Sequence, residues 1–148
     1  MYTRKTSKGV SWYRAHLETS LEWIRSSAPS LESRIIDIGG GASTLVDDLS
    51  ALGYRNLSVL DISQIALDEA KGRIAAHGNR IVWIQGDITS VTLPPHHYDL
   101  WHDRAVFHFL TNANDRASYV ETATESVKVG GFLIVATFSM VFIFASCA

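Results

Sequence analysis

The chain has 148 residues, of which 47% are hydrophobic and 19% are charged, so it is long enough for one hydrophobic core and too short for two ordinary domains. Its formal net charge of −2 and the scatter of its Lys and Arg residues exclude the basic surface typical of a nucleic-acid-binding protein. The single cysteine, Cys147, excludes an intramolecular disulfide and a cysteine-rich metal site. We therefore expect one cytoplasmic domain over residues 1–148, without a metal.

Helical and strand-like patterns alternate along the chain. Apolar residues at helical spacing predict an opening helix over Ser11–Ser27, ended by Pro29, within an N-terminal helical cap of residues 1–30. In the core over residues 34–139, strand-like runs are separated by helical patterns, which predicts an α/β fold with a doubly wound, mostly parallel sheet and flanking helices. The expected elements of the core are strands closing at Asp37, Asp61 and Asp87, helices over Thr44–Leu52, Gln64–Ala76 and Ala113–Val127, and strands over Tyr98–His102 and Gly131–Thr137.

A glycine-rich turn follows the first of these strands. Residues 34–45 read RIIDIGGGASTL, so Gly39, Gly40 and Gly41 stand between an apolar run and a helical pattern. Glycines at this point let a nucleotide approach the backbone at a helix N-terminus, although the turn alone is a weak signal. Thr44 replaces the third small residue of the dinucleotide motif, and the carboxylate of Asp37 would repel a pyrophosphate and attract a cation. A nicotinamide-dependent oxidoreductase is therefore disfavoured.

The same segment carries a resemblance to a known family. Asp37-Ile38-Gly39-Gly40-Gly41-Ala42-Ser43 resembles the first motif of the class I S-adenosylmethionine-dependent methyltransferases, an acidic residue followed by G-x-G-x-G, with Ser43 in place of the last glycine. The resemblance implies a Rossmann-like fold and S-adenosylmethionine as the cofactor, bound by Asp37, the three glycines and Ser43. A glycine turn without a ligand remains the alternative for this motif by itself.

Two further acids close the next two apolar runs. Asp61 lies 22 residues after Gly39, close to the offset of about 20 residues expected of a carboxylate that accepts hydrogen bonds from ribose hydroxyls. The resemblance implies that Asp87 hydrogen-bonds the adenine amino group, and that Ile62 and Ile88, next to the two acids, contact the cofactor. Each Asp alone could instead be a helix N-cap or a turn residue. Three acids that close successive strands in order favour the cofactor site.

The fourth strand runs into a motif that narrows the family. Residues 101–110, WHDRAVFHFL, resemble the segment between strand four and a short helix in small-molecule methyltransferases of this class, including bacterial members of unassigned substrate. The resemblance implies that Asp103 lies near the methionine moiety of the cofactor, and it makes Asp103 and His108 the candidate general bases if the acceptor must lose a proton. An ion pair between Asp103 and Arg104, and a core or supporting role for His108, remain open. A hydrolase is disfavoured because the chain has no G-x-S-x-G elbow.

Aromatic residues before the first strand offer a cover for the cofactor cleft. Methyltransferases of this class commonly close the cleft with this segment, so the resemblance implies that Trp12 and Tyr13 cover the sulfonium with their ring faces. Packing within the opening helix is the alternative. Trp83 and Trp101 stand inside apolar strands, and we expect both in the core.

The C-terminus departs from the family pattern. Residues 140–148 read MVFIFASCA, an apolar tail where the family continues with a helix and further strands. The resemblance implies a chain truncated or out of frame after about Ser139, without the last strands of the sheet. Strand five would then form an exposed edge, with self-association through this edge and the tail. The uncharged stretch over 129–148 is long enough to span a membrane, but its Gly, Val and Ile content favours a buried strand, and no membrane partner is expected.

Taken with the family resemblance, these observations predict an S-adenosylmethionine-dependent methyltransferase whose acceptor is a small molecule or is unidentified. A binding-only fragment, which holds the cofactor but transfers nothing because the acceptor side is missing, is the alternative. The chain has no N-P-P-Y motif of the kind found in enzymes that methylate amides or base amines, which disfavours a nucleic-acid or glutamine acceptor.

Overall fold

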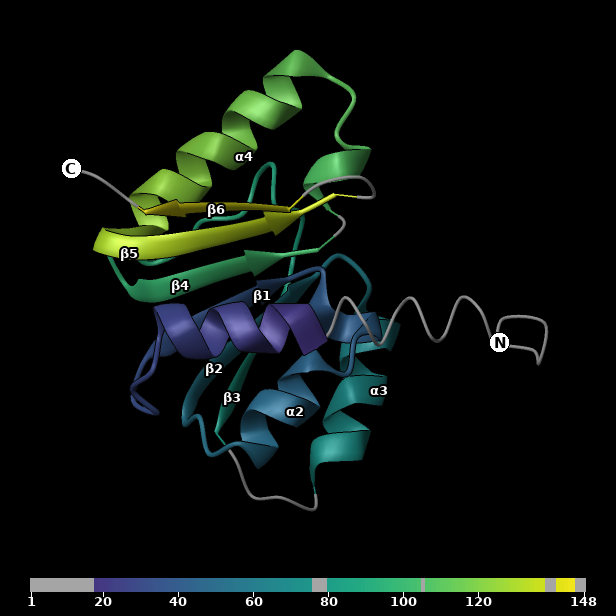
Figure 1. The fold of residues 1–148 in the computed structure, drawn as a ribbon. Coiled ribbons are helices and arrows are strands. Elements are labelled where there is room, and N and C mark those ends of the chain that lie inside the picture. The colour runs from purple at the N-terminus through teal and green to yellow at the C-terminus, as the bar shows by residue number, and fades with distance from the viewer. Residues whose placement is uncertain (1–17, 76–79, 105, 138–140, 146–148) are drawn as a thin grey trace.

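The computed structural model describes residues 18–75, 80–104, 106–137 and 141–145. In this part of the chain, six strands form one sheet with the order β3-β2-β1-β4-β5-β6 (Figure 1). Strands β1 to β5 run parallel, and β6 runs antiparallel to β5. The strands are β1 (Arg34–Ile38), β2 (Asn56–Asp61), β3 (Ile81–Gln85), β4 (Tyr98–Asp103), β5 (Val127–Ala136) and β6 (Val141–Ala145). The helices are a segment over 18–27, η2 (Gly40–Ala42), α2 (Leu45–Ala51), α3 (Gln64–Ile74), η4 (Phe107–Phe109) and α4 (Ala113–Ser126).

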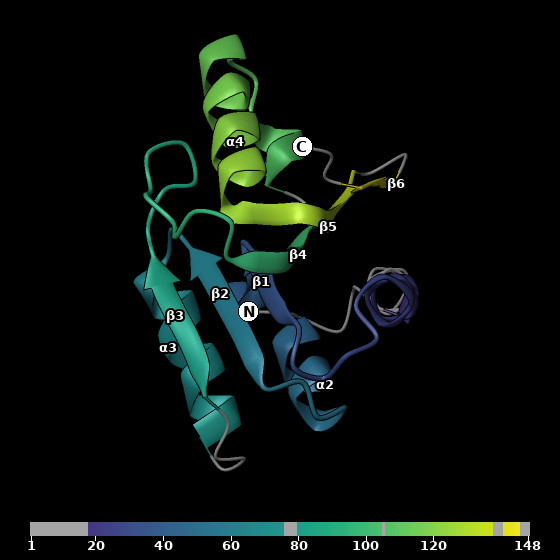
Figure 2. The same cartoon turned by 90° about the vertical axis from the view of Figure 1, so that its left-hand side faces the viewer.

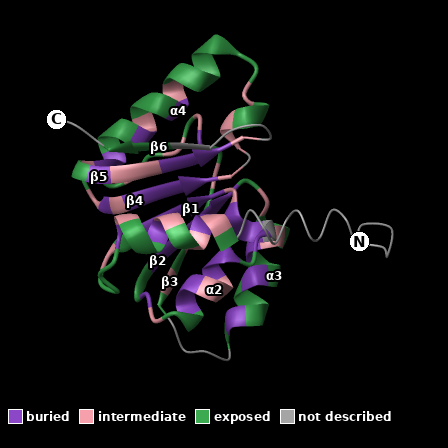
Figure 3. Cartoon of the chain, in the orientation of Figure 1, coloured by how far each residue is buried: buried purple, intermediate pink, exposed green. Residues whose placement is uncertain are grey.

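Helices cover both faces of the sheet, as Figure 2 shows, so the predicted doubly wound fold is confirmed. The segment over 18–27, α2 and α3 pack on one face, and α4 packs on the other. Successive residues of a strand point to opposite faces. Ile35 therefore belongs to the core under the first three helices, while Ile36 belongs to the core under α4. Burial is concentrated along the central strands β1 and β4 (Figure 3).

The two strand tryptophans pack against these cores. Trp101 is fully buried on the α4 face, where its Nε1 donates a hydrogen bond to the hydroxyl oxygen of Tyr119 at 2.9 Å. The two rings also meet edge to face. Trp83 is half-buried and packs from β3 against the other core. The prediction of a core position is confirmed for Trp101 and holds in part for Trp83.

Strand β5 begins earlier than the sequence pattern predicts. It starts at Val127, four residues before the expected Gly131, and its register with β4 shifts between Tyr98 and Leu100. Gly130 lies within this irregular stretch with a φ of 81°, a left-handed conformation that favours glycine. The glycine pair therefore marks a bulge inside the strand rather than the strand's beginning.

The expectation that strand five is the exposed edge of the sheet is wrong. Residues Val141–Ala145 of the apolar tail form β6, which pairs antiparallel with β5 from Ala136↔Val141 to Phe132↔Ala145. An alternation of β-branched and aromatic residues suits a strand, and the tail thereby satisfies the backbone groups of β5. The edge on this side of the sheet is β6. Among the described residues, no helix combines the length and the apolar character needed to cross a membrane.

Candidate cofactor site

A cavity of about 410 Å³ lies at the carboxyl ends of the first three strands. Parallel pairing brings the ends of β1, β2 and β3 to one edge of the sheet. Strand order reverses at β1, which lies between β2 and β4, and such a switch point is the usual ligand site of an open α/β sheet. The residues that line the cavity are Ile38, Gly39, Leu60, Asp61, Ile62, Gly86, Asp87, Ile88, Val106, Phe109 and Leu110.

The glycine turn after β1 is tightly packed. Gly39 has a φ of 69°, and its N–H donates to the carbonyl oxygen of Leu60 at 2.6 Å. A Cβ on Gly40 would lie 2.3 Å from Oδ2 of Asp37, so no larger residue fits there without movement. Ser43 is not among the residues that line the cavity, and its buried hydroxyl accepts the N–H of Leu45 at 3.1 Å at the start of α2.

Asp61 holds two turns at once. Its Oδ2 accepts the N–H of Gly41 at 3.0 Å, and its Oδ1 accepts the N–H of Ser63 at 2.9 Å. The N-cap of α3 is Ser63 itself, whose hydroxyl accepts the N–H of Ala66 at 3.2 Å. Each carboxylate oxygen can accept two hydrogen bonds. The structure thus leaves Asp61, which lines the cavity, able to accept further donors from a ligand.

Asp87 follows β3 and is exposed at the cavity. Its Oδ1 accepts the hydroxyl of Thr89 at 2.7 Å and the N–H of Thr89 at 2.9 Å. The hydrogen bond from the hydroxyl, and after it the bond from the N–H, hold the pKa of Asp87 below its usual value. Asp87 is therefore ionised at neutral pH, although it also serves the local turn.

Apolar side chains form the walls between the two acids. Ile88 is buried, whereas Ile62 and Phe109 are 67% and 66% exposed, which is high for large apolar residues. Val106 and Leu110 complete the wall on the side of η4. The sequence interpretation assigned no role to Val106, Phe109 or Leu110. The sequence signal for these three residues was the WHDRAVFHFL segment, in which Asp103 and His108 were the candidate site residues.

Asp37 is not among the residues that line the cavity. It is 4% exposed, and its Oδ1 accepts a hydrogen bond from Nδ1 of His102 at 2.8 Å. Its Oδ2 has no hydrogen-bond partner in the part of the chain that the structure describes, and it faces the turn at Gly40. A buried carboxylate oxygen without a donor is costly. It therefore points to a cationic or hydrogen-bond-donating ligand at the glycine turn.

Asp103 and His108 take different places. Asp103 is fully buried on the α4 face, where its Oδ1 accepts the N–H of Val106 at 2.7 Å. Its Oδ2 accepts the N–H of Phe107 at 2.9 Å and the hydroxyl of Tyr119 at 2.5 Å. Burial, and after it the charge of Asp103, raise the pKa of Tyr119 far above its usual value, so the phenol stays a donor. His108 is exposed on η4, with its ring edge to face against Phe109. Neither Asp103 nor His108 lines the cavity.

Trp12 and Tyr13, the expected cover of the cleft, lie outside the described residues.

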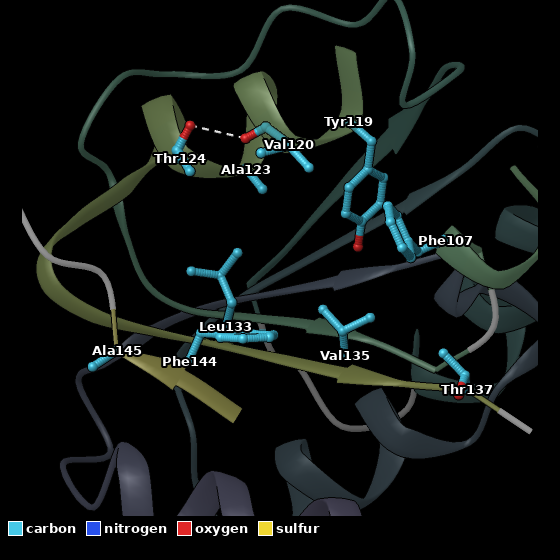
Figure 4. A pocket seen from close by; sticks show the side chains of 10 residues that line it. All are labelled: Phe107, Tyr119, Val120, Ala123, Thr124, Leu133, Val135, Thr137, Phe144 and Ala145. Atoms are coloured by element: carbon cyan, nitrogen blue, oxygen red, sulfur yellow. Dashed lines mark hydrogen bonds between the residues drawn. The ribbon is translucent and has the colours of Figure 1, made fainter. Parts of the chain in front are cut away.

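A second cavity, of about 500 Å³, lies between α4 and strands β5 and β6 (Figure 4). Figure 4 shows Tyr119 pointing from α4 toward Phe107, across from Val135 on β5. Carboxylates are absent from the described lining of this cavity, which sets it apart from the acid-lined cavity beyond η4.

Comparisons with known proteins agree with this geometry. Residues 35–131, well over half of the chain, match the family model described as "Methyltransferase domain". The eEF1A lysine and N-terminal methyltransferase of Bos taurus is 25% identical over 93 residues, which cover 63% of this chain and 13% of that protein. Its Drosophila melanogaster homologue is 26% identical over 103 residues, which cover 70% of this chain and 15% of that protein.

Solved structures share the fold. An S-adenosylmethionine-dependent methyltransferase from Clostridium acetobutylicum has a TM-score of 0.71 and 19% identity, over 83% of this chain and 49% of that one. The chain thus spans about half of this solved structure and a much smaller share of the two curated relatives. The family match begins in β1 and ends within β5, so it includes every strand end that forms the cavity. The chain belongs to the methyltransferase domain family, whose cofactor is S-adenosylmethionine.

Proposed function

We propose that this chain binds S-adenosylmethionine at the carboxyl ends of β1, β2 and β3 and transfers its methyl group to an acceptor in the cytoplasm. The observation that carries the proposal is the position of Asp61 and Asp87 in one apolar cavity beside the glycine turn. An acid at the position of Asp61 suits the ribose of any adenine nucleotide, whereas the further carboxylates of Asp87 and Asp37 oppose phosphate groups and favour a ligand with positive charge. S-adenosylmethionine carries an ammonium and a sulfonium and has no phosphate.

Each group that lines the cavity suits a part of this cofactor. Asp61 would accept the ribose hydroxyls through the lone pairs that its two backbone donors leave. Asp87 would accept the adenine amino group, and the exposed faces of Ile62 and Phe109, with Ile88 beneath, would enclose the ring. The backbone of the turn over Gly39, Gly40 and Gly41, with Ser43 behind it, would lie against the methionine end, and the unpartnered Oδ2 of Asp37 would face its ammonium.

The chemistry asks little of the protein beyond positioning. When bound, S-adenosylmethionine supplies a methyl group on a positively charged sulfur that is already a good leaving group. The chain's part is to align the acceptor and exclude water. Asp103 holds the η4 turn through Val106 and Phe107, which makes it a positioning residue in this proposal. His108 remains the candidate general base for an acceptor that must lose a proton, with Trp12 and Tyr13 as the proposed cover.

The acceptor is a small molecule or a group still to be identified. The curated relatives are named for eEF1A lysine and N-terminal methylation, but the aligned segment is only 13–15% of their length. The identity of their acceptor therefore cannot be assigned to this chain. A cofactor-binding chain without transfer activity is the alternative, and methyl transfer from labelled cofactor to a broad acceptor panel separates the two.

Copies of the chain would associate through the outer edge of β6, the last strand of the sheet. Its described side chains at Ile143 and Phe144 are 43% and 53% exposed, and unpaired strand edges with apolar side chains promote pairing between chains.

Isothermal titration calorimetry tests the cofactor assignment. We expect saturable binding of S-adenosylmethionine and of its demethylated product, and no binding of NADH. If the folded chain binds neither sulfur ligand, the proposed function is wrong. Binding of NADH in preference to both would instead support an oxidoreductase.

A further inference from the structure

Three buried side chains from three separate elements form one hydrogen-bonded chain. Ser20 lies in the helical segment over 18–27, His102 on β4 and Asp37 on β1. Nε2 of His102 lies 2.9 Å from the hydroxyl oxygen of Ser20, and Nδ1 lies 2.8 Å from Oδ1 of Asp37. The three residues are 2%, 1% and 4% exposed. Such a network is costly to bury unless every member is satisfied.

The proton positions follow from the donors available. An ionised Asp37 only accepts hydrogen bonds, so Nδ1 of His102 carries the proton and donates to Oδ1. In a neutral imidazole, Nε2 then accepts the hydroxyl proton of Ser20. In both the neutral and the charged imidazole, Nδ1 is the donor to Asp37. His102 therefore fixes how the Asp37 carboxylate is turned.

The order Ser, His, Asp is also that of a hydrolase triad, but the surroundings oppose such a role. Ser20 lines neither of the two cavities described above, so these cavities offer no place for a substrate beside its hydroxyl. A nucleophilic serine needs a place beside it for the reacting carbonyl. The chain of hydrogen bonds therefore has a different use.

That use is visible at the other carboxylate oxygen. With Oδ1 held by His102, Oδ2 of Asp37 is directed at the glycine turn, 2.3 Å from where a Cβ of Gly40 would lie. Oδ2 has no donor among the described residues. We infer that His102 is a positioning residue that presents Oδ2 of Asp37 to the ammonium of the cofactor, and that Ser20 in turn orients His102. The inference rests on the proposed cofactor site.

This role predicts which ligands bind more weakly when His102 is replaced. S-adenosylmethionine and S-adenosylhomocysteine carry the ammonium, whereas 5′-methylthioadenosine has the same adenosine and sulfur but lacks the amino-acid end. Loss of His102 should therefore weaken binding of the first two and spare the third. A general defect in folding or in the sheet would weaken all three.

The full-length chain and four variants test the inference by calorimetry with these three ligands. His102→Leu removes the donor, His102→Asn retains an N–H near the position of Nδ1, and Ser20→Ala removes the outer member. Ser126→Ala is the matched control, because Ser126 is equally buried but ends α4 on the other side of the sheet. We expect His102→Leu to lower the affinity for S-adenosylmethionine about tenfold or more, because the charge-assisted hydrogen bond between Asp37 and the ammonium is lost. The affinity for methylthioadenosine should fall less than about threefold. His102→Asn should recover most of the affinity, Ser20→Ala should show a smaller loss with the same selectivity, and Ser126→Ala should match the native chain.

The outcomes separate the inference from the function it rests on. If the native chain binds S-adenosylmethionine and the His102 variants lose affinity equally for all three ligands, or lose none, His102 is structural and the inference is overturned. If the native chain binds none of the ligands, the cofactor assignment fails and the inference fails with it.

A second readout is measured on the native chain, and a variant is needed only to assign one signal. Nitrogen NMR of the ¹⁵N-histidine-labelled native chain should show His102 protonated at Nδ1, with a shift on adding S-adenosylmethionine that methylthioadenosine does not produce. His102→Asn assigns the signal among the six histidines. Protonation at Nε2 alone would contradict the proposed donor.

Discussion

The carboxylate of Asp61, which closes β2, accepts the backbone N–H of Gly41 at 3.0 Å across 20 residues of sequence. Through its other oxygen it also accepts the N–H of Ser63 ahead of α3. The side chain of Asp61 thus links the glycine turn after β1 to the start of α3. The shape of the turn and the proposed contact with the ribose therefore depend on the same residue.

Replacing Asp61 should impair the cofactor site more than replacing a nearby acid without a role there. Asp61→Ala removes both backbone contacts and the proposed ribose contact, so we expect about a ten- to hundredfold loss of affinity for S-adenosylmethionine. Asp48→Ala is the control, because Asp48 lies on α2 and does not line the cavity. Calorimetry on the two variants measures the difference. Equal affinities would remove Asp61 from the site.

Two glycines allow a matched test of the turn. A Cβ on Gly40 would collide with Oδ2 of Asp37, so Gly40→Ala should lower the free energy of unfolding by about 1–3 kcal/mol and weaken cofactor binding. Gly72 lies in α3 with open space around its Cβ position, so Gly72→Ala should raise the free energy of unfolding by about 0.5–1 kcal/mol. Urea denaturation measures both. A neutral Gly40→Ala variant with unchanged binding would contradict the close approach at the turn.

The pH dependence of Asp87 follows from its lowered pKa. Folding favours the ionised carboxylate, so its contribution to stability is present above its usual pKa of about 3.9 and is lost as pH falls through the lower pKa of the folded chain. Carbon NMR should show a titration midpoint for Asp87 below the usual value. Thr89→Val removes the hydroxyl, the larger cause, and should raise the midpoint.

A midpoint for Asp87 at or above the usual value in the native chain would show that the Thr89 hydroxyl does not bind the carboxylate. Between pH 6 and 8, Asp87 stays ionised, so we expect no change in cofactor affinity from this residue over that range.

Association of chains through β6 can be tested by introducing one charged residue on that strand. Ile143→Lys places a cation on the edge strand and should lower the sedimentation-derived fraction of dimers and larger species at tens of micromolar. Ile65→Lys is the control, because Ile65 is 74% exposed on α3, which packs on β2 and β3 at the opposite end of the sheet from β6. A native chain that sediments as a monomer, or equal association of the two variants, would contradict the role of β6.

The sequence by itself was enough to predict the order of the core strands and helices and the acids that lie at the strand ends. An apolar run that ends in an acid is a local pattern, and parallel strands necessarily bring their carboxyl ends to one edge. One cavity is consequently lined by Gly39, Asp61 and Asp87, each of which lies at or just after the end of a strand. The order of the core strands and helices followed from the same alternation of periods.

Only the tertiary structure decided what neighbouring residues do. His102 and Asp103 are adjacent in sequence, but successive strand residues face opposite sides of a sheet. His102 therefore meets Asp37 and Ser20 beneath the N-terminal helical segment, while Asp103 is buried under α4 and holds η4. The pairing of β6 with β5 and the contribution of Phe109 to the cavity are equally non-local. Such contacts depend on which helix packs on which face, and this choice is made by the free energy of the whole core rather than by any short pattern.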